Sequence, residues 1–295
     1  MRLAEIERHV SSMQELQRIV GAMRAIASMR MQEAVRALAS VREFGNALAE
    51  AVHDAVAIAA EETHLIDDDG DSRRHADATR VPARRSAHGA IVLFASEHGF
   101  VGGFNQRLLE AVEQQLSDAD TLIIVGTRGA ALAAERGHAA AWSHPLATRL
   151  AGIAETVRVL EEALLPRISR EEIVRAEVVF GRYTRSGELD IERQRLFPLE
   201  LAPASGQRRG LPPLHDLPIP ELLERLTAEY MLAELTEAAI EALAAENAAR
   251  FAAMESARDN VGRKLETLRL DVSRARQEEI TTELLDLITG EQAVR

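Results

Sequence analysis

The chain has 295 residues, of which 46% are apolar and only 3% aromatic, and its formal net charge is -12. This acidic balance disfavours a phosphate backbone as a partner, so no nucleic acid is expected. Cysteine is absent, which excludes disulfides, thiolate nucleophiles and cysteine metal clusters and fits a cytoplasmic location. The amino terminus is charged, and no stretch reaches the roughly 18 apolar residues of a membrane span. We therefore expect any membrane association to depend on partners.

The first 81 residues contain no proline, because all nine prolines fall between Pro82 and Pro220. An uninterrupted helix is therefore predicted over residues 1–62. Its apolar residues follow alternating steps of three and four, the pattern of a coiled-coil seam: Leu3, Ile6, Val10, Met13, Val20, Ala27, Met31, Ala34, Leu38, Val41, Leu48 and Val52. At ~1.5 Å per residue this helix would measure on the order of 85 Å, so it needs a partner.

Residues 219–295 are predicted to form a second long helix, interrupted only by Gly262. The same spacing recurs there at Phe251, Met254, Val261, Leu265, Leu268, Val272 and Ala275. One seam begins the chain and the other ends it, so we predict that the two helices pair antiparallel, unless each meets a different molecule. Alanines within 47–60 and 238–245 would let the two helices approach closely.

Five arginines of the first helix recur every six residues: Arg18, Arg24, Arg30, Arg36 and Arg42. At about 100° per residue each lies 240° around the axis from the one before, so they form no single basic stripe. Ordinary solvation of a long helix and contact with partners on several sides both remain open.

Residues 90–218 alternate strand-like and helix-like segments, which predicts an open α/β, Rossmann-like body with a parallel sheet of four or five strands. The runs AIVLFAS and TLIIVG are β-prone, and further strands are expected over 177–181 and 189–199. Helices are expected over 105–116, 127–136 and 155–165. Residues 63–89 are polar and predict a linker, whereas the five prolines within 202–220 predict an irregular connection before the last helix.

The segment GFVGGFN, with Gly99, Gly102 and Gly103, follows the first strand, where an α/β protein would bind phosphate. Its spacing matches neither dinucleotide-binding nor phosphate-loop patterns, and no lysine or hydroxyl residue stands where the latter needs one. The structural alternative is a tight turn that lets the helix pack close to its strand. We favour that alternative and expect no bound cofactor.

Catalytic and metal sites are not expected from the remaining residues. The nine histidines are scattered without metal-ligand spacing, and no G-x-S-x-G elbow exposes a serine nucleophile. Paired acids such as Asp67 and Asp68 or Glu278 and Glu279 lie on polar segments without a predicted cleft. The chain is thus predicted to have no catalytic site of its own.

The two ends and the glycine turn together resemble the gamma subunit of F-type ATP synthases over nearly the whole chain. The carboxyl-terminal signature RQ-x-x-IT-x-E is highly specific, and it is present as Arg276, Gln277, Ile280, Thr281 and Glu283. The amino-terminal signature keeps Ile19, Ala22, Met23, Ala27 and Met31, with basic residues at Arg18 and Arg30. The family's glycine turn is retained as Ser96, Gly99, Gly102, Gly103, Phe104 and Asn105.

The resemblance implies that the paired helices form a central rotor inside a head of alpha and beta subunits, with the body on the epsilon subunit and the membrane ring of c subunits. It implies contacts of Arg276 and Gln277 with one beta subunit and of Met23 with another. It also implies a peripheral location on the cytoplasmic face of a bacterial inner membrane.

The chain departs from the family pattern at several positions. These include Glu97-His98 for Asp-Arg, Phe100-Val101 for Leu-Cys, Val272-Ser273 for Tyr-Asn, and Val20-Gly21 for Thr-Lys. They mark a divergent member and leave a paralogous or sodium-pumping ATPase open. Two other classes compete: a structural adaptor built on the same hairpin, and an α/β enzyme with oligomerising arms, which ligand saturation at the glycine turn would reveal.

Overall fold

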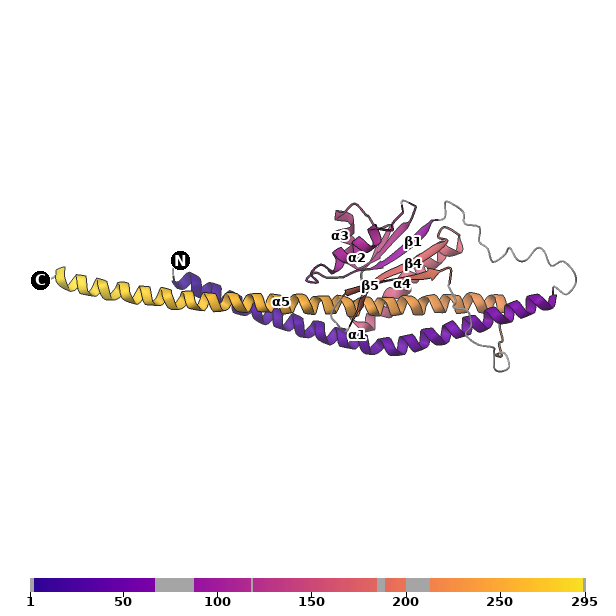
Figure 1. Cartoon of the computed structure of the whole chain (residues 1–295), viewed down its shortest axis with the longest axis horizontal. Coiled ribbons are helices and arrows are strands. Elements are labelled where there is room, and N and C mark those ends of the chain that lie inside the picture. The colour runs from indigo at the N-terminus through magenta and orange to yellow at the C-terminus, as the bar shows by residue number, and fades with distance from the viewer. Residues whose placement is uncertain (1–2, 67–87, 118, 185–188, 200–212, 294–295) are drawn as a thin grey trace. The chain divides into compact units, whose positions relative to one another are not determined.

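The computed structural model describes residues 3–66, 88–117, 119–184, 189–199 and 213–293 (Figure 1). Its contacts form two compact units: residues 1–29 with 250–295, here called the helix-pair unit, and residues 30–249, here called the α/β unit. Most of the predicted linker, residues 67–87, lies outside the described residues, as does the stretch 200–212. The domain boundaries expected at residues 62, 89 and 218 stay predictions.

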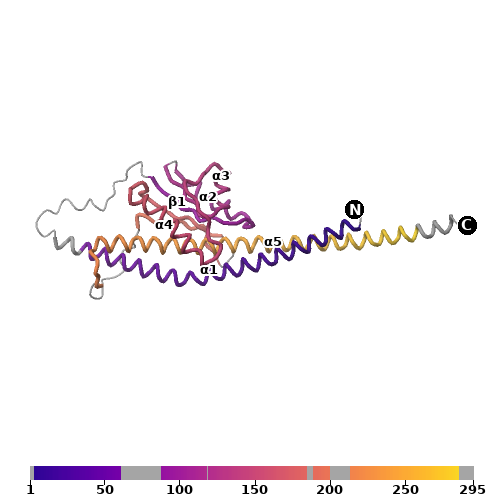
Figure 2. The backbone as a smooth tube through the Cα atoms, turned by 180° about the vertical axis from the view of Figure 1, so that it is seen from behind, coloured from indigo at the N-terminus to yellow at the C-terminus, as the bar shows by residue number. Residues whose placement is uncertain are grey.

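Both predicted long helices are present. Helix α1 runs from Leu3 to Ile66 and α5 from Ile219 to Ala293, and each contributes to both units (Figures 1 and 2). In the helix-pair unit they run antiparallel, because Glu7 and Arg24 of α1 meet Arg276 and Glu255 of α5, so that numbers rise on one helix as they fall on the other. Antiparallel pairing of the chain's two ends is thereby confirmed.

The predicted seam is also correct. Every seam residue named above is buried or half-buried, among them Val20 and Ala27 on α1 and Val261 and Leu265 on α5. Apolar residues at this spacing line one stripe of each helix, so pairing removes both stripes from water at once.

The five regularly spaced arginines do not share one role. Arg24 and Arg42 bind carboxylates of α5, whereas Arg18 and Arg36 each donate to a carbonyl of their own helix. At least two of the five therefore make contacts between the long helices of this chain.

The sheet of the α/β unit has five strands in the order β3-β2-β1-β4-β5. These are β1 (Gly89–Phe94), β2 (Thr121–Val125), β3 (Trp142–His144), β4 (Arg175–Tyr183) and β5 (Leu189–Phe197). The first four are parallel, and β5 runs antiparallel to β4. The sequence did not predict strand β3, because three residues are too few to show a periodicity.

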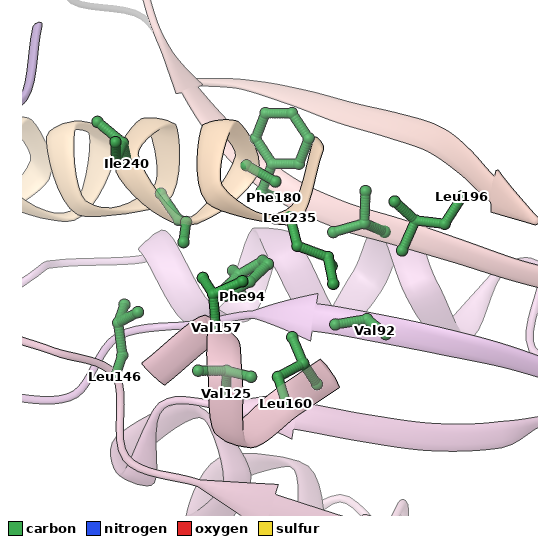
Figure 3. Packing of buried hydrophobic residues seen from close by; sticks show 14 of the residues in the cluster. Val92, Phe94, Val125, Leu146, Val157, Leu160, Phe180, Leu196, Leu235 and Ile240 are labelled. Atoms are coloured by element: carbon green, nitrogen blue, oxygen red, sulfur yellow. The ribbon is translucent and has the colours of Figure 1, made fainter. Parts of the chain in front are cut away.

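Helices cover both faces of this sheet. Helix α2 (Phe104–Glu113) and α3 (Thr127–Glu135) cover one face, which buries Ile91, Leu93 and Ile124. Helix α4 (Ile153–Ser169) and the middle of α5 cover the other, on Val92, Phe94, Val125 and Phe180 (Figure 3). Alternate side chains of a strand point to opposite faces, so burial on both faces explains the continuous apolar runs in β1 and β2.

The middle of α5 is buried on all sides. Every residue from Ala238 to Asn247 is buried, and the alanines of this stretch pack in clusters that include the sheet. Ala34 and Leu38 of α1 join the same cluster. The alanines at 238–245 therefore let α5 lie close to the strands. They do not face residues 47–60 as expected: Arg42 already meets Glu237 and Glu241, so the antiparallel pairing places residues 47–60 beside an earlier part of α5.

Candidate partner-contact site

The glycine segment joins β1 to α2, as predicted. Gly102 has a φ of +58° and Phe100 one of +62°, in the left-handed region that favours glycine. Among the described residues, a Cβ built on Gly99, Gly102 or Gly103 would meet no atom within 4 Å, so close packing is not the reason for these three glycines. Backbone conformation explains Gly102.

Asn105 fastens this turn to the end of β1. Its side chain accepts a hydrogen bond from the Ser96 amide at 2.9 Å and donates one to the Ser96 hydroxyl at 2.7 Å. Ser96 and Asn105 are both buried, so each satisfies the other's polar atoms. Two polar residues beside a glycine turn thus have a structural role that needs no ligand.

The place where this sheet edge could hold an anion is taken by Glu97. Its carboxylate accepts hydrogen bonds from the Thr127 amide at 2.9 Å, the Thr127 hydroxyl at 2.8 Å and the Leu146 amide at 2.9 Å. Thr127 is the first residue of α3, where unpaired amides attract negative charge. The chain supplies its own anion there.

Helix α5 fills the space beside the carboxyl end of β4. A Cβ on Gly181 would lie 2.9 Å from the Phe104 ring and 3.3 Å from Ala245 Cβ. In open α/β sheets a nucleotide occupies the crevice where the strand order reverses, here between β1 and β4. Side chains of α2 and α5 lie in that region, which favours the structural interpretation of the glycine turn over nucleotide binding.

The three predicted beta-contact residues lie on the helix-pair unit in two separate places. Arg276 and Gln277 are adjacent on α5 and exposed, and Arg276 Nη2 donates to Glu7 Oε1 at 2.6 Å. Gln277 borders a shallow groove of about 390 Å³ with Arg274, Glu278, Thr281 and Thr282. Met23 is half-buried on α1, next to the Arg24–Glu255 pair, which lies about 30 Å along α5 from Arg276 at ~1.5 Å per residue.

An exposed apolar face beside Met23 was not singled out from the sequence. Leu16, Ile19, Ile26 and Met29 are 41%, 51%, 47% and 57% exposed. With Met23, residues 16, 19, 23 and 26 follow steps of three and four, offset from the buried seam. A second apolar stripe on one helix was the signal that could have found this face, here called the Met23 face.

The carboxyl-terminal part of α5 exposes a similar set. Leu270, Ile280, Leu284 and Leu285 are each more than half exposed. Exposed apolar patches of this kind mark surfaces that partners cover. The helix-pair unit thus carries exposed apolar side chains of the type that partners cover in larger assemblies.

Residues 2–294 match the family model described as ATP synthase. The chain belongs to the gamma-subunit family of ATP synthases. As a member of this family it is a non-catalytic central-stalk component of the F-type rotary enzyme.

Solved structures share the fold of this gamma-family chain. A chain of the Euglena gracilis mitochondrial ATP synthase OSCP/F1/c-ring assembly, in rotational state 3, has a TM-score of 0.63 and 15% identity, over 99% of this chain and 94% of that one. A chain from the rotor of the same enzyme in rotational state 1 has a TM-score of 0.59 and 14% identity. The match covers 94% of this chain and 98% of that one. A chain from the central stalk/c-ring of the Tetrahymena thermophila mitochondrial ATP synthase has a TM-score of 0.55 and 15% identity. The match covers 81% of this chain and 99% of that one.

Within the part of the gamma-family chain that the structure describes, no helix is both long enough and apolar enough to cross a bilayer. The same residues hold no group of three or more side chains able to ligate a metal.

Proposed function

We propose that this gamma-family chain couples ion flow through a membrane ring of c subunits to conformational change in a head of three alpha and three beta subunits. The observation that carries the proposal is the family match over residues 2–294. The antiparallel helix pair with exposed apolar faces supports it, because a rotor needs a stiff element whose surface partners can contact.

An asymmetric rotor makes different contacts with three otherwise equivalent catalytic subunits. Each contact favours one conformation of the subunit that it touches, so turning the rotor changes which subunit binds nucleotide tightly. The chemistry then occurs in the partners, and the proposal holds for proton or sodium coupling.

Two surfaces of the helix-pair unit are proposed to contact beta subunits. Arg276 and Gln277 form one; both are exposed, and the guanidinium can exchange Glu7 for a carboxylate of a partner. Met23 and the apolar side chains beside it form the other. Met23 lies next to Arg24, whose partner Glu255 is about 30 Å from Arg276 along α5. We therefore infer that the two surfaces touch different parts of the head.

The remaining partners are proposed to be the epsilon subunit and the c-subunit ring. The solved structures with this fold come from assemblies named for F1, OSCP, rotor and c-ring, which supports the choice of partners. The proposed location is peripheral, on the cytoplasmic face of a bacterial inner membrane, held there through these partners.

The test is affinity purification of the tagged chain from gently solubilised membranes of its native cell. We expect alpha and beta chains at three copies each per copy of this chain, together with ATPase activity. Recovery of this chain alone, or with unrelated proteins, would contradict the proposal and favour an adaptor or an enzyme.

A further inference from the structure

Gly21 of α1 and Gly262 of α5 lie inside the long helices of the helix-pair unit. Neither has a left-handed backbone, and among the described residues a Cβ on either would meet no atom within 4 Å. Neither conformation nor close packing therefore explains these two glycines. A glycine lowers the equilibrium constant for forming a helical turn by about 2- to 5-fold relative to alanine, because it loses more backbone freedom. Both positions thus weaken the turns that contain them.

Polar side chains stand in the seam at the same level. Gln17 is one helical turn from Gly21, and Arg258 is one turn from Gly262. They border a groove of about 540 Å³ with Asp259, Gly262 and Arg263. Of the two seam lines of each helix, only the one with Val20 and Val261 stays apolar and buried here, and polar seam residues lower the stability of a coiled coil. We call residues 17–21 and 258–262 the glycine layer.

Polar contacts between the two helices flank the glycine layer. On one side Arg24 Nη1 lies 2.6 Å from Glu255 Oε2, and its Cζ lies 5.6 Å from the centre of the Phe251 ring. On the other side Arg276 Nη2 lies 2.6 Å from Glu7 Oε1. Among the described residues between these two ion pairs, no ion pair or side-chain hydrogen bond joins α1 to α5. The pairing is therefore fastened on both sides of the layer and held within it by the apolar seam.

We propose that the glycine layer is a flexible joint, at which α1 and α5 open locally more often than in the turns on either side. Weak helical turns, polar seam positions and the groove all make opening easier there, whereas the fastened flanks keep the helices paired. The surfaces proposed to contact beta subunits lie on opposite sides of the layer, Met23 on one and Arg276 with Gln277 on the other. A joint between them lets each surface follow its own partner. That consequence rests on the proposed function.

Hydrogen exchange of the full chain, followed by mass spectrometry of overlapping peptides, measures local opening. Fraying alone would make protection fall steadily along each helix toward the free end of the pair. The joint predicts a local minimum instead. After correction for intrinsic exchange rates, protection in the glycine layer should be about 3-fold or more lower than in the flanks, which are residues 6–13 and 24–31 of α1 and 250–256 and 265–272 of α5.

Gly21→Ala with Gly262→Ala should raise protection in the layer by about 2- to 5-fold per glycine, since each alanine has open space. Gln17→Leu with Arg258→Leu should raise it as well, because a second apolar line would then cross the layer. Gly45→Ala is the matched control. Gly45 is also helical, and the nearest atom to its Cβ would be 4.0 Å away, but it lies in the α/β unit, so protection in the layer should stay unchanged.

Far-ultraviolet circular dichroism checks that each variant stays helical. A protection profile that falls steadily toward the free end, with no minimum in the glycine layer, would overturn the proposal. So would a minimum that keeps its full depth in both double variants. The measurement needs no partner subunit, so it can fail while the proposed function stands.

Discussion

Single side chains decide whether the carboxyl edge of this sheet binds a ligand. The Glu97 carboxylate accepts from the Thr127 amide at the start of α3, and the Ser96 carbonyl accepts from the next two amides. Asn105 bonds to the Ser96 amide and hydroxyl. The sequence shows the glycines of the turn but cannot show where a carboxylate points. That direction follows from contacts between residues that are 30 or more positions apart.

Close packing does occur at glycines that the sequence did not single out, among them Gly181 and Gly129. A Cβ on Gly129 would lie 2.1 Å from Ala95 Cβ, so Gly129→Ala should destabilise the α/β unit by about 1–3 kcal/mol. Gly45→Ala is the control: it is also helical, its nearest neighbour would be Glu234 Oε1 at 4.0 Å, and we expect a gain of about 0.5–1 kcal/mol. Urea unfolding followed by the fluorescence of Trp142, the one tryptophan, measures both. Equal effects would contradict the packing argument.

Glu234 of α5 predicts a pH dependence. Burial raises the pKa of its carboxyl above the usual 4.5, and the charge of Glu237 adds to this, whereas the hydrogen bond from Tyr230 opposes it. The folded chain then holds this proton more tightly than the unfolded chain, so this group's contribution to stability falls as pH rises above about 4.5.

Glu234→Gln should therefore raise the melting temperature at neutral pH, and it should remove this group's share of any fall in melting temperature as pH rises above about 4.5. Glu224→Gln, an exposed carboxylate of the same helix, is the control and should change the decline little. If the melting temperature of Glu234→Gln fell with pH as steeply as that of the parent chain, the Glu234 carboxyl would not be the source of the pH dependence.

At the scale of elements, the long helices were the most predictable part of the fold. A proline-free run with a seam of period 3.5 can bury its apolar stripe only by pairing along its length, and both seams came out at the predicted residues. Strands β1 and β2 were equally clear as apolar runs. Strand β3 and the burial of α5 on all sides could not be predicted from the sequence, because both depend on neighbours far along the chain.

The edges of the sheet carry their own protection. Strand β3 has three residues and is followed by Pro145, and β5 carries Asp190, Glu192, Arg193 and Arg195. Short strands, proline and charge all discourage pairing with another chain. This leaves the helix-pair unit as the better surface for partners.

Leu268 tests the continuity of α5. It is 7% exposed in the seam, and proline there would remove a backbone hydrogen bond and kink the helix, at a cost of about 3 kcal/mol or more. We expect Leu268→Pro to prevent assembly with partner subunits, measured by co-purification. Leu268→Ala removes the side chain but keeps the backbone bond, and it should still assemble. Normal assembly of the proline variant would contradict the need for an unbroken helix.

At the scale of the whole molecule, the two units divide the charge unequally. The helix-pair unit holds 12 basic and 12 acidic side chains, so the α/β unit carries the entire net charge of -12. The total charge therefore says little about the surfaces proposed to touch the catalytic head.

Coupling between ATP hydrolysis and ion pumping depends on the whole molecule and its partners. Replacing Arg276 and Gln277 together by alanine should weaken ATP-driven ion pumping by several fold while the complex still assembles, because both side chains are exposed and hold no core together. Proton or sodium uptake into inverted membrane vesicles, compared with ATP hydrolysis in the same vesicles, measures this. Arg269→Ala, an exposed residue about two turns earlier on α5 and outside the groove that Gln277 borders, is the control. Unchanged pumping in the double variant would count against these contacts.

The sequence by itself determined the two long helices, their seam residues, the α/β alternation and the family, because periodicity and local motifs are properties of neighbouring residues. Tertiary structure alone decided that Glu97 fills the edge of the sheet, that α5 is buried between layers, and that Arg24 meets Phe251 and Glu255. These outcomes depend on contacts across up to 231 positions of chain, where no local pattern reports which side chains will meet.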